Sequence, residues 1–249
     1  MLEEANTIFD YLPIEAGSEK LYTQHLWQAF TAIVEKGDPA KSFAIMPFHL
    51  LFMLAAQYKV YKLSDSHKTE YLNKISDKIV YRQTNIKVLQ DNIFNSSSQS
   101  SVKNLSLIKE KNLFDFFEIV NLEKDIIEEA QELITNRSKY AHANCNIEEE
   151  IEQKINSYLK ILNSIQLKFE NINNSSQNWA EELENDCGSE DEDINEFFEQ
   201  RFLQSHFSPR DFGDVIRKLL ISANANQLKW IANKGIYDFF ATTPKPLKH

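Results

Sequence analysis

The chain has 249 residues, of which 42% are apolar, and its 27 basic and 37 acidic residues give a formal net charge of −10. This length and apolar content are sufficient for the hydrophobic core of one large or two small domains. The two cysteines, Cys145 and Cys187, show neither CxxC nor histidine-rich spacing, which argues against a disulfide framework and a zinc site.

We expect a cytoplasmic protein that does not associate with membranes. No N-terminal signal segment is evident, and the longest apolar stretch, Phe43–Gln57, is interrupted by Pro47 and His49 and is too short to cross a bilayer. Few glycines and prolines, long periodic runs and no alternating strand pattern predict an all-α fold. We expect an up-and-down helical bundle over residues 1–170 and a C-terminal helical extension over residues 171–249.

The first two long helices are predicted from their ends and their apolar content. The first spans about Ser18–Lys36 and ends at Gly37-Asp38-Pro39. The second spans about Ala40–Leu63 and is apolar nearly all round, as expected for the most buried helix of a bundle. Pro47 should bend this helix or mark its true beginning. We interpret His49 as a hydrogen-bonded core residue.

The third predicted helix spans about Asp65–Phe94 and carries a positively charged face. Its ordinary interpretation is a solvated surface, and the alternative is a track for the RNA backbone, with Tyr71 and Tyr81 near enough to stack on bases. The basic residues of this face recur every four positions: Lys74, Lys78 and Arg82.

After the third predicted helix, a linker and a short helix precede two amphipathic helices, and the most informative motif lies between these two. A polar linker, Asn95–Ser101, precedes a short helix predicted within Leu105–Val120. A helical stripe then runs through Leu122, Ile126, Ala130 and Leu133, and its next step falls on Arg137, which places this arginine on the buried stripe. A second amphipathic helix follows with Asn146 as N-cap, and its apolar positions are Ile147, Ile151, Ile155, Leu159, Leu162, Ile165 and Phe169.

Between these helices, Arg137 and His142 lie five positions apart. On one unbroken helix they would point about 140° apart, at 3.6 residues per turn. They can act together only if the helix breaks between them or if a second copy of the chain supplies the partner groups. The structural alternative is that Arg137 stabilises the C-terminal end of its helix and His142 fills a turn.

An arginine followed after four to six residues by a histidine, at a junction in an all-helical bundle, resembles the HEPN superfamily of ribonucleases. The resemblance covers roughly residues 17–170. It implies a homodimer whose two Arg/His pairs meet at a two-fold axis and cut RNA without a metal or other cofactor. It also implies a toxin or phage-defence role, with an antitoxin or regulatory protein as a possible partner.

A second pair with the same spacing, Arg201 and His206, competes with the first. The first pair fits the family better, because the family usually places a polar residue after the arginine and a small residue before the histidine, as Ser138 and Ala141 are here. A subgroup that is paired with nucleotidyltransferase antitoxins has a tyrosine two positions after the histidine. This chain has Asn144 there, so a modification of that tyrosine is not supported.

The motif supplies the groups that metal-free cleavage needs. The imidazole of His142 can exchange a proton near neutral pH, and the guanidinium of Arg137 can bind phosphate oxygens and stabilise charge in the transition state. Ser138 and Asn144 could orient the imidazole or the phosphate, and Lys139 is a further candidate for RNA binding. We therefore expect an endoribonuclease acting on RNA, and the alternative is a non-catalytic helical interaction or regulatory module.

The C-terminal third has a different composition. A polar run, Asn171–Gln177, is predicted to end the bundle, and Glu181–Glu199 then contains ten acidic residues and no basic one. Removing this tract leaves 27 basic and 27 acidic residues, so the net charge of −10 lies in the tract. It is either a solvated linker or helix, or a segment that competes with RNA for a basic surface or docks a basic partner. Short aromatic-rich helices are predicted within Pro209–Ile221 and Gln227–Phe240.

Overall fold

The fold is known here from a computed structural model, which describes residues 1–13, 18–37, 40–79, 105, 108–141, 151–175 and 206–222. Every regular element within these residues is a helix, which confirms the predicted all-α class. The predicted helix Gln227–Phe240, the acidic tract and the N-cap Asn146 lie outside the described residues.

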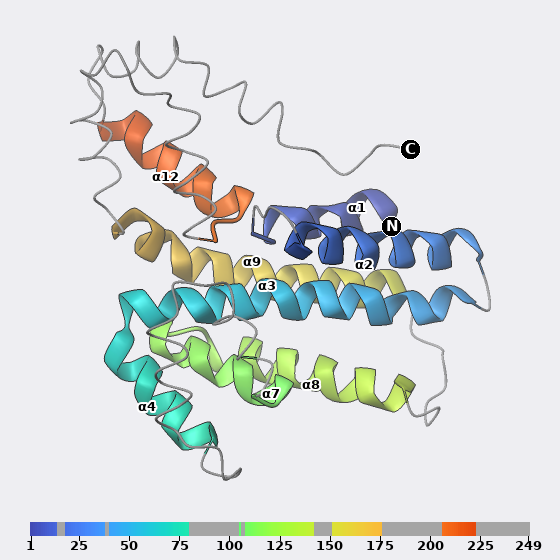
Figure 1. Cartoon of the computed structure of the whole chain (residues 1–249), viewed down its shortest axis with the longest axis horizontal. Coiled ribbons are helices and arrows are strands. Elements are labelled where there is room, and N and C mark those ends of the chain that lie inside the picture. The colour runs from blue at the N-terminus through green and yellow to red at the C-terminus, as the bar shows by residue number, and fades with distance from the viewer. Residues whose placement is uncertain are drawn as a thin grey trace.

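Four long helices build the bundle, and their direction alternates along the chain. They are α2 (Ser18–Glu35), α3 (Ile45–Ser66), α8 (Lys124–Ala141) and α9 (Ile151–Ser175). Figure 1 shows α3 and α9 side by side in the centre, with α2 on one side of them and α8 on the other. Since the second and fourth helices run in the same direction, residues early in α3 meet residues early in α9.

The central helix α3 has the sequence of a core helix. It follows a 3₁₀ helix, η2 (Ala40–Ala44), and begins at Ile45, so Pro47 lies in its first turn, where its missing N–H disturbs no helical hydrogen bond. The expectation that Pro47 marks the beginning is therefore confirmed. Ala40–Ser64 is long and apolar enough to span a membrane, yet 72% of its most apolar window is buried inside the bundle.

Aromatic side chains fill the space between α3, α9 and the shorter helices α4 (Lys68–Ile79), α7 (Glu110–Leu113) and η4 (Phe114–Val120). Phe52 stacks on Phe114 at 5.5 Å between ring centroids, and Tyr71 packs against Phe116 at the same separation. Offset and tilted ring pairs at these separations stabilise a core beyond the area that they bury. Tyr71 is fully buried, so the expectation that it could stack on RNA bases is wrong.

The amphipathic patterns of α8 and α9 are confirmed by their burial. Ile126 and Ala130 of α8, and Ile155, Leu162 and Phe169 of α9, all lie in the core. The polar run after Phe169 was predicted to end the bundle, but α9 continues to Ser175. Ile172 packs against the core and keeps this stretch helical, so the asparagines alone do not determine where the helix ends.

The C-terminal helix α12 (Pro209–Ser222) lies across the end of α9, as Figure 1 shows, and contacts η1 (Thr7–Asp10), which follows α1 (Leu2–Asn6). Its start is a reciprocal cap: the N–H of Asp211 donates to the Ser208 hydroxyl at 3.2 Å, and the N–H of Ser208 donates to the Asp211 carboxylate at 3.1 Å. Pro209 is the first helical residue, a position that needs no N–H. The predicted helix Pro209–Ile221 is confirmed.

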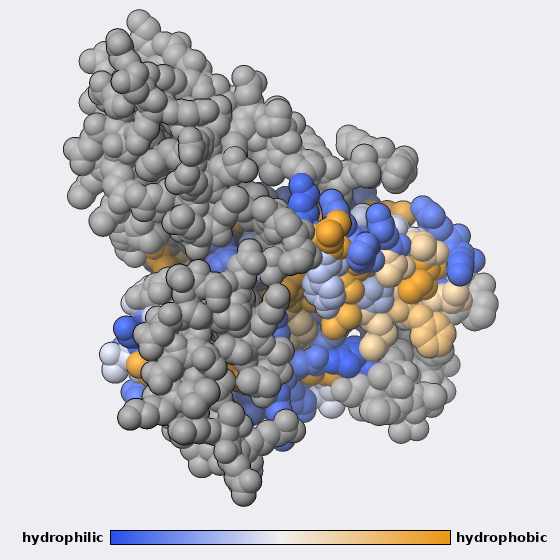
Figure 2. Space-filling view, in the orientation of Figure 1, coloured by the Kyte–Doolittle hydropathy of each residue, from blue (hydrophilic) through white to orange (hydrophobic). Residues whose placement is uncertain are grey.

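The surface around α2 is of mixed character. Figure 2 shows hydrophilic and hydrophobic residues interspersed over the end of the bundle at the right of the picture. Single exposed apolar side chains are ordinary on a folded protein. Within the described residues the large exposed ones are Leu21, Tyr22, Phe43, Leu50, Leu167 and Ile221.

Candidate functional site

Arg137 lies in the last turns of α8, which continues without a break to Ala141. A helix break between Arg137 and Ala141 is therefore excluded, while His142 itself lies outside the described residues. The side chain of Arg137 is 19% exposed, and a guanidinium nitrogen forms an ion pair with the carboxylate of Glu110, the first residue of α7. The arginine therefore lies at the edge of the core, where the predicted buried stripe placed it.

The Glu110 carboxylate links Arg137 to a buried pair of side chains. Its Oε2 atom lies 3.3 Å from Nε2 of His49, and Nδ1 of His49 lies 3.0 Å from the hydroxyl of Tyr158. His49 on α3 has no exposed surface, and Tyr158 on α9 is also buried. Three helices and the start of α7 thus contribute one side chain each to a chain of polar contacts that runs from the core to the surface.

Burial fixes the protonation of this network. Burial lowers the pKa of His49, against the raising effect of its hydrogen bond to Glu110, so the imidazole is neutral at pH 7. The hydrogen bond from His49, with a further contribution from Arg137, outweighs the raising effect of burial and holds the pKa of Glu110 below its usual value. Since a carboxylate only accepts, Nε2 of His49 donates to Glu110 and Nδ1 accepts from the Tyr158 hydroxyl. The interpretation of His49 as a hydrogen-bonded core residue is confirmed.

Arg137 retains donor capacity beyond its ion pair. Its Nε atom is buried and has no hydrogen-bond partner among the described residues. A guanidinium has five N–H donors in a planar fork that matches carboxylate and phosphate oxygens. Glu110 therefore fixes one edge of Arg137 and leaves donors for another acceptor.

The remaining predicted site residues are not brought together within the described part of the chain. Ser138 and Lys139 belong to the last turn of α8, and the positions of their side chains are not described. Lys74 forms an ion pair with Glu118 of η4 and lies on a different helix from Arg137. Outside the described residues lie the side chain of Lys78 and all of Arg82, His142, Asn144 and Tyr81.

The second Arg/His pair is only half described. His206 precedes α12, and its ring lies 5.1 Å from that of Tyr58 and 5.4 Å from that of Tyr61, both on α3. Arg201 lies outside the described residues. His206 is thus an aromatic contact between the C-terminal segment and α3.

A second polar centre, which we call the lysine–aspartate cluster, joins α12 to the bundle. Asp211 is 1% exposed, and its carboxylate lies 2.5 Å from the ammonium of Lys59 and 2.9 Å from that of Lys62, both on α3. The amide of Gln166 on α9 completes the cluster: it accepts from Lys59 at 2.6 Å and donates to Asp211 at 3.1 Å and to Asp214 at 2.8 Å.

The two signs of charge respond differently to this burial. Burial alone would raise the pKa of Asp211, but Lys59 and Lys62 outweigh it and hold the pKa well below its usual value. Burial lowers the pKa of Lys62 to about 7, against the opposing effect of Asp211. Burial also lowers the pKa of Lys59. The aspartate is therefore charged at neutral pH, while Lys62 is close to its titration point.

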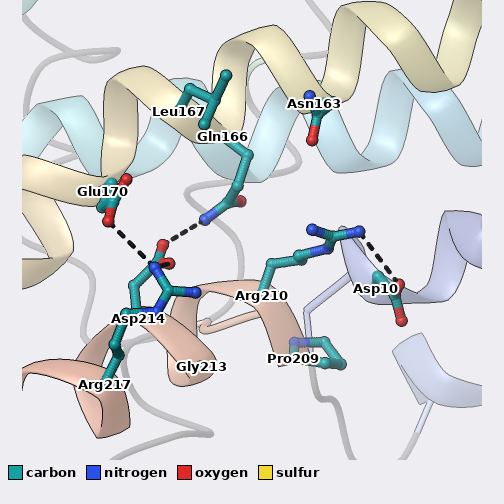
Figure 3. Close-up of a pocket in the computed structure, with 10 residues that line it drawn as sticks. All are labelled: Asp10, Asn163, Gln166, Leu167, Glu170, Pro209, Arg210, Gly213, Asp214 and Arg217. Atoms are coloured by element: carbon teal, nitrogen blue, oxygen red, sulfur yellow. Dashed lines mark hydrogen bonds and ion pairs between the residues drawn. The ribbon is translucent and has the colours of Figure 1, made fainter.

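Figure 3 shows a pocket of about 260 Å³ beside this cluster, between α9, α12 and η1. Arg210 points toward Asp10 at 3.7 Å, and Arg217 reaches Glu170 at 3.1 Å. These side chains are about half exposed, and ion pairs of this kind contribute at most about 1 kcal/mol. The arginines of the pocket are engaged by neighbouring carboxylates, so it is an unconvincing candidate for the main site.

Sequence reasoning missed the residues that surround Arg137 and those of the lysine–aspartate cluster. Glu110 and Tyr158 had no signal, because each lies on an ordinary helical pattern and only the packing of three helices brings them to His49. The lysines had a weak signal: Lys59 and Lys62 follow directly on the most apolar helical run of the chain, where buried lysines require partners.

Comparisons with protein-family models, with curated proteins and with solved structures gave no match to this chain. Among the described residues, no group of three or more histidine, cysteine, aspartate or glutamate side chains could hold a metal ion. The function of the site is therefore inferred from the geometry around Arg137 and from the motif that this residue begins.

Proposed function

We propose that the protein is a metal-independent endoribonuclease in which Arg137 binds the scissile phosphate and His142 transfers protons. The observation that supports this most is the placement of Arg137. Its guanidinium is anchored by Glu110 at the edge of the core, keeps a buried Nε without a partner among the described residues, and lies one turn before the end of α8. His142 is the next residue in the sequence after Ala141.

The reaction uses only groups of this kind. His142 takes the proton of the 2′-OH, the resulting oxygen attacks the adjacent phosphorus, and Arg137 stabilises the added negative charge on the phosphate oxygens. The bond to the 5′-oxygen breaks, and this oxygen receives a proton from an imidazolium. The products are a 2′,3′-cyclic phosphate and a 5′-hydroxyl end.

The proposal includes a two-fold homodimer. α8 is unbroken from Arg137 to Ala141. If the helix continued through the next residue, Arg137 and His142 would point about 140° apart, and a second copy of the chain would supply the partner groups. The second imidazole then acts as the acid while the first acts as the base. A role as a toxin or phage-defence effector, held in check by an antitoxin or regulatory protein, is part of the same proposal.

A second candidate function is a non-catalytic helical module that binds or regulates another protein. The ion pair between Arg137 and Glu110 favours it, because the same contact, extended through His49 to Tyr158, would be present if the arginine only joined α7 to α8. In that case the uncommitted donors of Arg137 would bind backbone or side-chain oxygens near the helix end.

Incubation of the purified full-length chain with total RNA in excess EDTA separates the two candidates. The nuclease produces fragments with cyclic phosphate and 5′-hydroxyl ends, and the Arg137→Ala variant, purified in parallel, controls for a contaminating ribonuclease. Intact RNA, or equal cleavage by wild type and variant, favours the helical module. Light scattering at micromolar concentration tests the dimer, and a monomer would count against the shared site.

A further inference from the structure

One face of α3 combines cationic and aromatic side chains and is covered by the C-terminal segment. Lys59 and Lys62 carry the charges, and Tyr58 and Tyr61 carry the rings, all within two turns of the helix. We call these four residues the α3 face. Its cover is the segment His206–Asp214, which supplies an aromatic ring and a carboxylate to it.

The contacts between this segment and the α3 face resemble those that a nucleotide makes. The His206 ring lies 5.1 Å from the Tyr58 ring, tilted by 45°, and 5.4 Å from the Tyr61 ring, nearly edge-on at 80°, so both tyrosine rings face an aromatic group of the segment. The Asp211 carboxylate lies between two ammonium groups at 2.5 Å and 2.9 Å, as a phosphate does. Lys62 also lies 3.7 Å from the centre of the Phe207 ring.

We propose that the α3 face is a binding surface for single-stranded RNA, and that the segment His206–Asp214 occupies it as an intramolecular mimic of a nucleotide. The choice of RNA as ligand rests on the proposed function. The docked state observed here is then the closed state, and RNA gains access to the α3 face when α12 moves away.

The attachment of α12 is suited to release. Thirty residues, 176–205, separate the end of α9 from His206 in the sequence. Its peripheral ion pairs, Arg210 with Asp10 and Arg217 with Glu170, are exposed (Figure 3). His206 has a positive φ of 50°, a conformation uncommon for a non-glycine residue.

The buried charges also distinguish this contact from ordinary core packing. An aspartate between two desolvated lysines is often no more stable than apolar side chains of similar size, so burial of these charges is weak evidence for a purely structural contact. Lysines that bind phosphate when α12 is released remain in place, and need a counter-charge, when α12 covers them. Asp211 provides the counter-charge in the closed state.

The test uses the full chain and an RNA oligonucleotide with 2′-O-methyl groups, which lacks the attacking hydroxyl and reports binding without cleavage. Val215→Asp places a charge on the buried face of α12 and leaves the α3 face intact, whereas Ile221→Asp makes the same kind of change at a position that is 80% exposed. Trypsin sensitivity at Arg217 reports whether α12 has been released. Asp211→Asn, similar in shape but uncharged, is the second releasing variant.

We expect the releasing variants to bind the oligonucleotide about ten- to a hundredfold more tightly than wild type, since the closed state holds most molecules inactive. Ile221→Asp should bind like wild type. Adding Lys59→Gln and Lys62→Gln to a releasing variant should abolish the gain and reduce the logarithmic salt slope by about 1.4, the value for two phosphate contacts.

The inference is overturned if a folded, trypsin-sensitive variant binds no more tightly than wild type, or if the gain survives loss of both lysines. These results are independent of the nuclease assay. Tighter binding of the modified oligonucleotide together with intact natural RNA would refute the nuclease and leave the binding surface standing. Cleavage of natural RNA by wild type, with no change in oligonucleotide binding in the releasing variants, would support the nuclease and refute the binding surface.

Discussion

Removing the Asp211 carboxylate tests the energetic role of the lysine–aspartate cluster. The Asp211→Ala change leaves two ammonium groups, on Lys59 and Lys62, in an almost fully buried site without the carboxylate that lies 2.5 Å and 2.9 Å from them. Removing one partner of a buried ion pair typically lowers stability by about 3 to 5 kcal/mol, because the other charge stays buried without a counter-charge. A cost of this size lowers the free energy of opening α12 and increases the exchange of its amide hydrogens by a factor on the order of 10² to 10⁴.

Hydrogen exchange measured by mass spectrometry on peptides covering 206–222 gives this quantity directly. Asp10→Ala is the matched control, because it removes the partner of Arg210 from a half-exposed ion pair at 3.7 Å and should change exchange by no more than about twofold. Replacing the cluster by Lys59→Met, Lys62→Met and Asp211→Leu should restore most of the protection, since no charge is then left unpaired. An increase below fivefold in Asp211→Ala would refute the reasoning that this carboxylate fastens α12.

Three further changes test other parts of the structure. Because burial lowers the pKa of Lys62 to about 7 while the unfolded value is near 10.5, the unfolded chain binds more protons between these pH values, and stability should rise with pH across this window. In urea titrations, the free energy of unfolding of wild type should increase from pH 7 to pH 9 by roughly 2 kcal/mol more than that of Lys62→Met. An equal increase in both proteins would contradict the assignment to Lys62. Tyr158→Phe removes the donor to buried His49 and should cost about 1 to 2 kcal/mol, against less than about 0.5 kcal/mol for Tyr11→Phe, whose hydroxyl makes only a 3.4 Å contact to Asn163. Glu110→Gln should lower the rate of RNA cleavage about tenfold, because Arg137 loses its anchor. Glu129→Gln, which removes the ion-pair partner of Lys160 on α9 and does not contact Arg137, should leave the rate unchanged; equal rates for both variants would show that Glu110 does not position the arginine.

Most helices of this protein could be predicted from the sequence, because residues at their ends and the spacing of their apolar residues determine them. The ends of α2 follow from Ser18 and from Gly37, which adopts a positive φ of 70° that glycine favours. The burial of α3 follows from its apolar circumference, and the faces of α8 and α9 follow from their three-to-four spacing. The end of α9 could not be predicted in this way, because the packing of Ile172 outweighs the weak helix propensity of the neighbouring asparagines.

The contacts of the candidate site depend on packing between distant segments. Helical periodicity predicted Arg137 on the buried stripe, and its side chain, 19% exposed, lies at the edge of the core. Its partner Glu110 lies 27 residues earlier in the chain, and the Tyr158 hydroxyl reaches His49 across a separation of 109 residues. A local pattern in one sequence cannot predict contacts between residues so far apart in the chain. The same holds for Asp211, which lies 152 residues from Lys59 and looks in sequence like an ordinary capping residue of its own helix.

The central claim, that Arg137 and His142 cut RNA, is tested most directly by cleavage rates of purified variants in EDTA. Arg137→Ala and His142→Ala should each lower the rate by about 10² to 10⁴, with circular-dichroism spectra like that of wild type. Arg137→Lys keeps the charge but loses the planar fork, and should recover only part of the activity. His25→Ala, on the exposed surface of α2, is the control and should cleave at the wild-type rate. Folded Arg137→Ala and His142→Ala variants that cleave as fast as wild type would contradict the account.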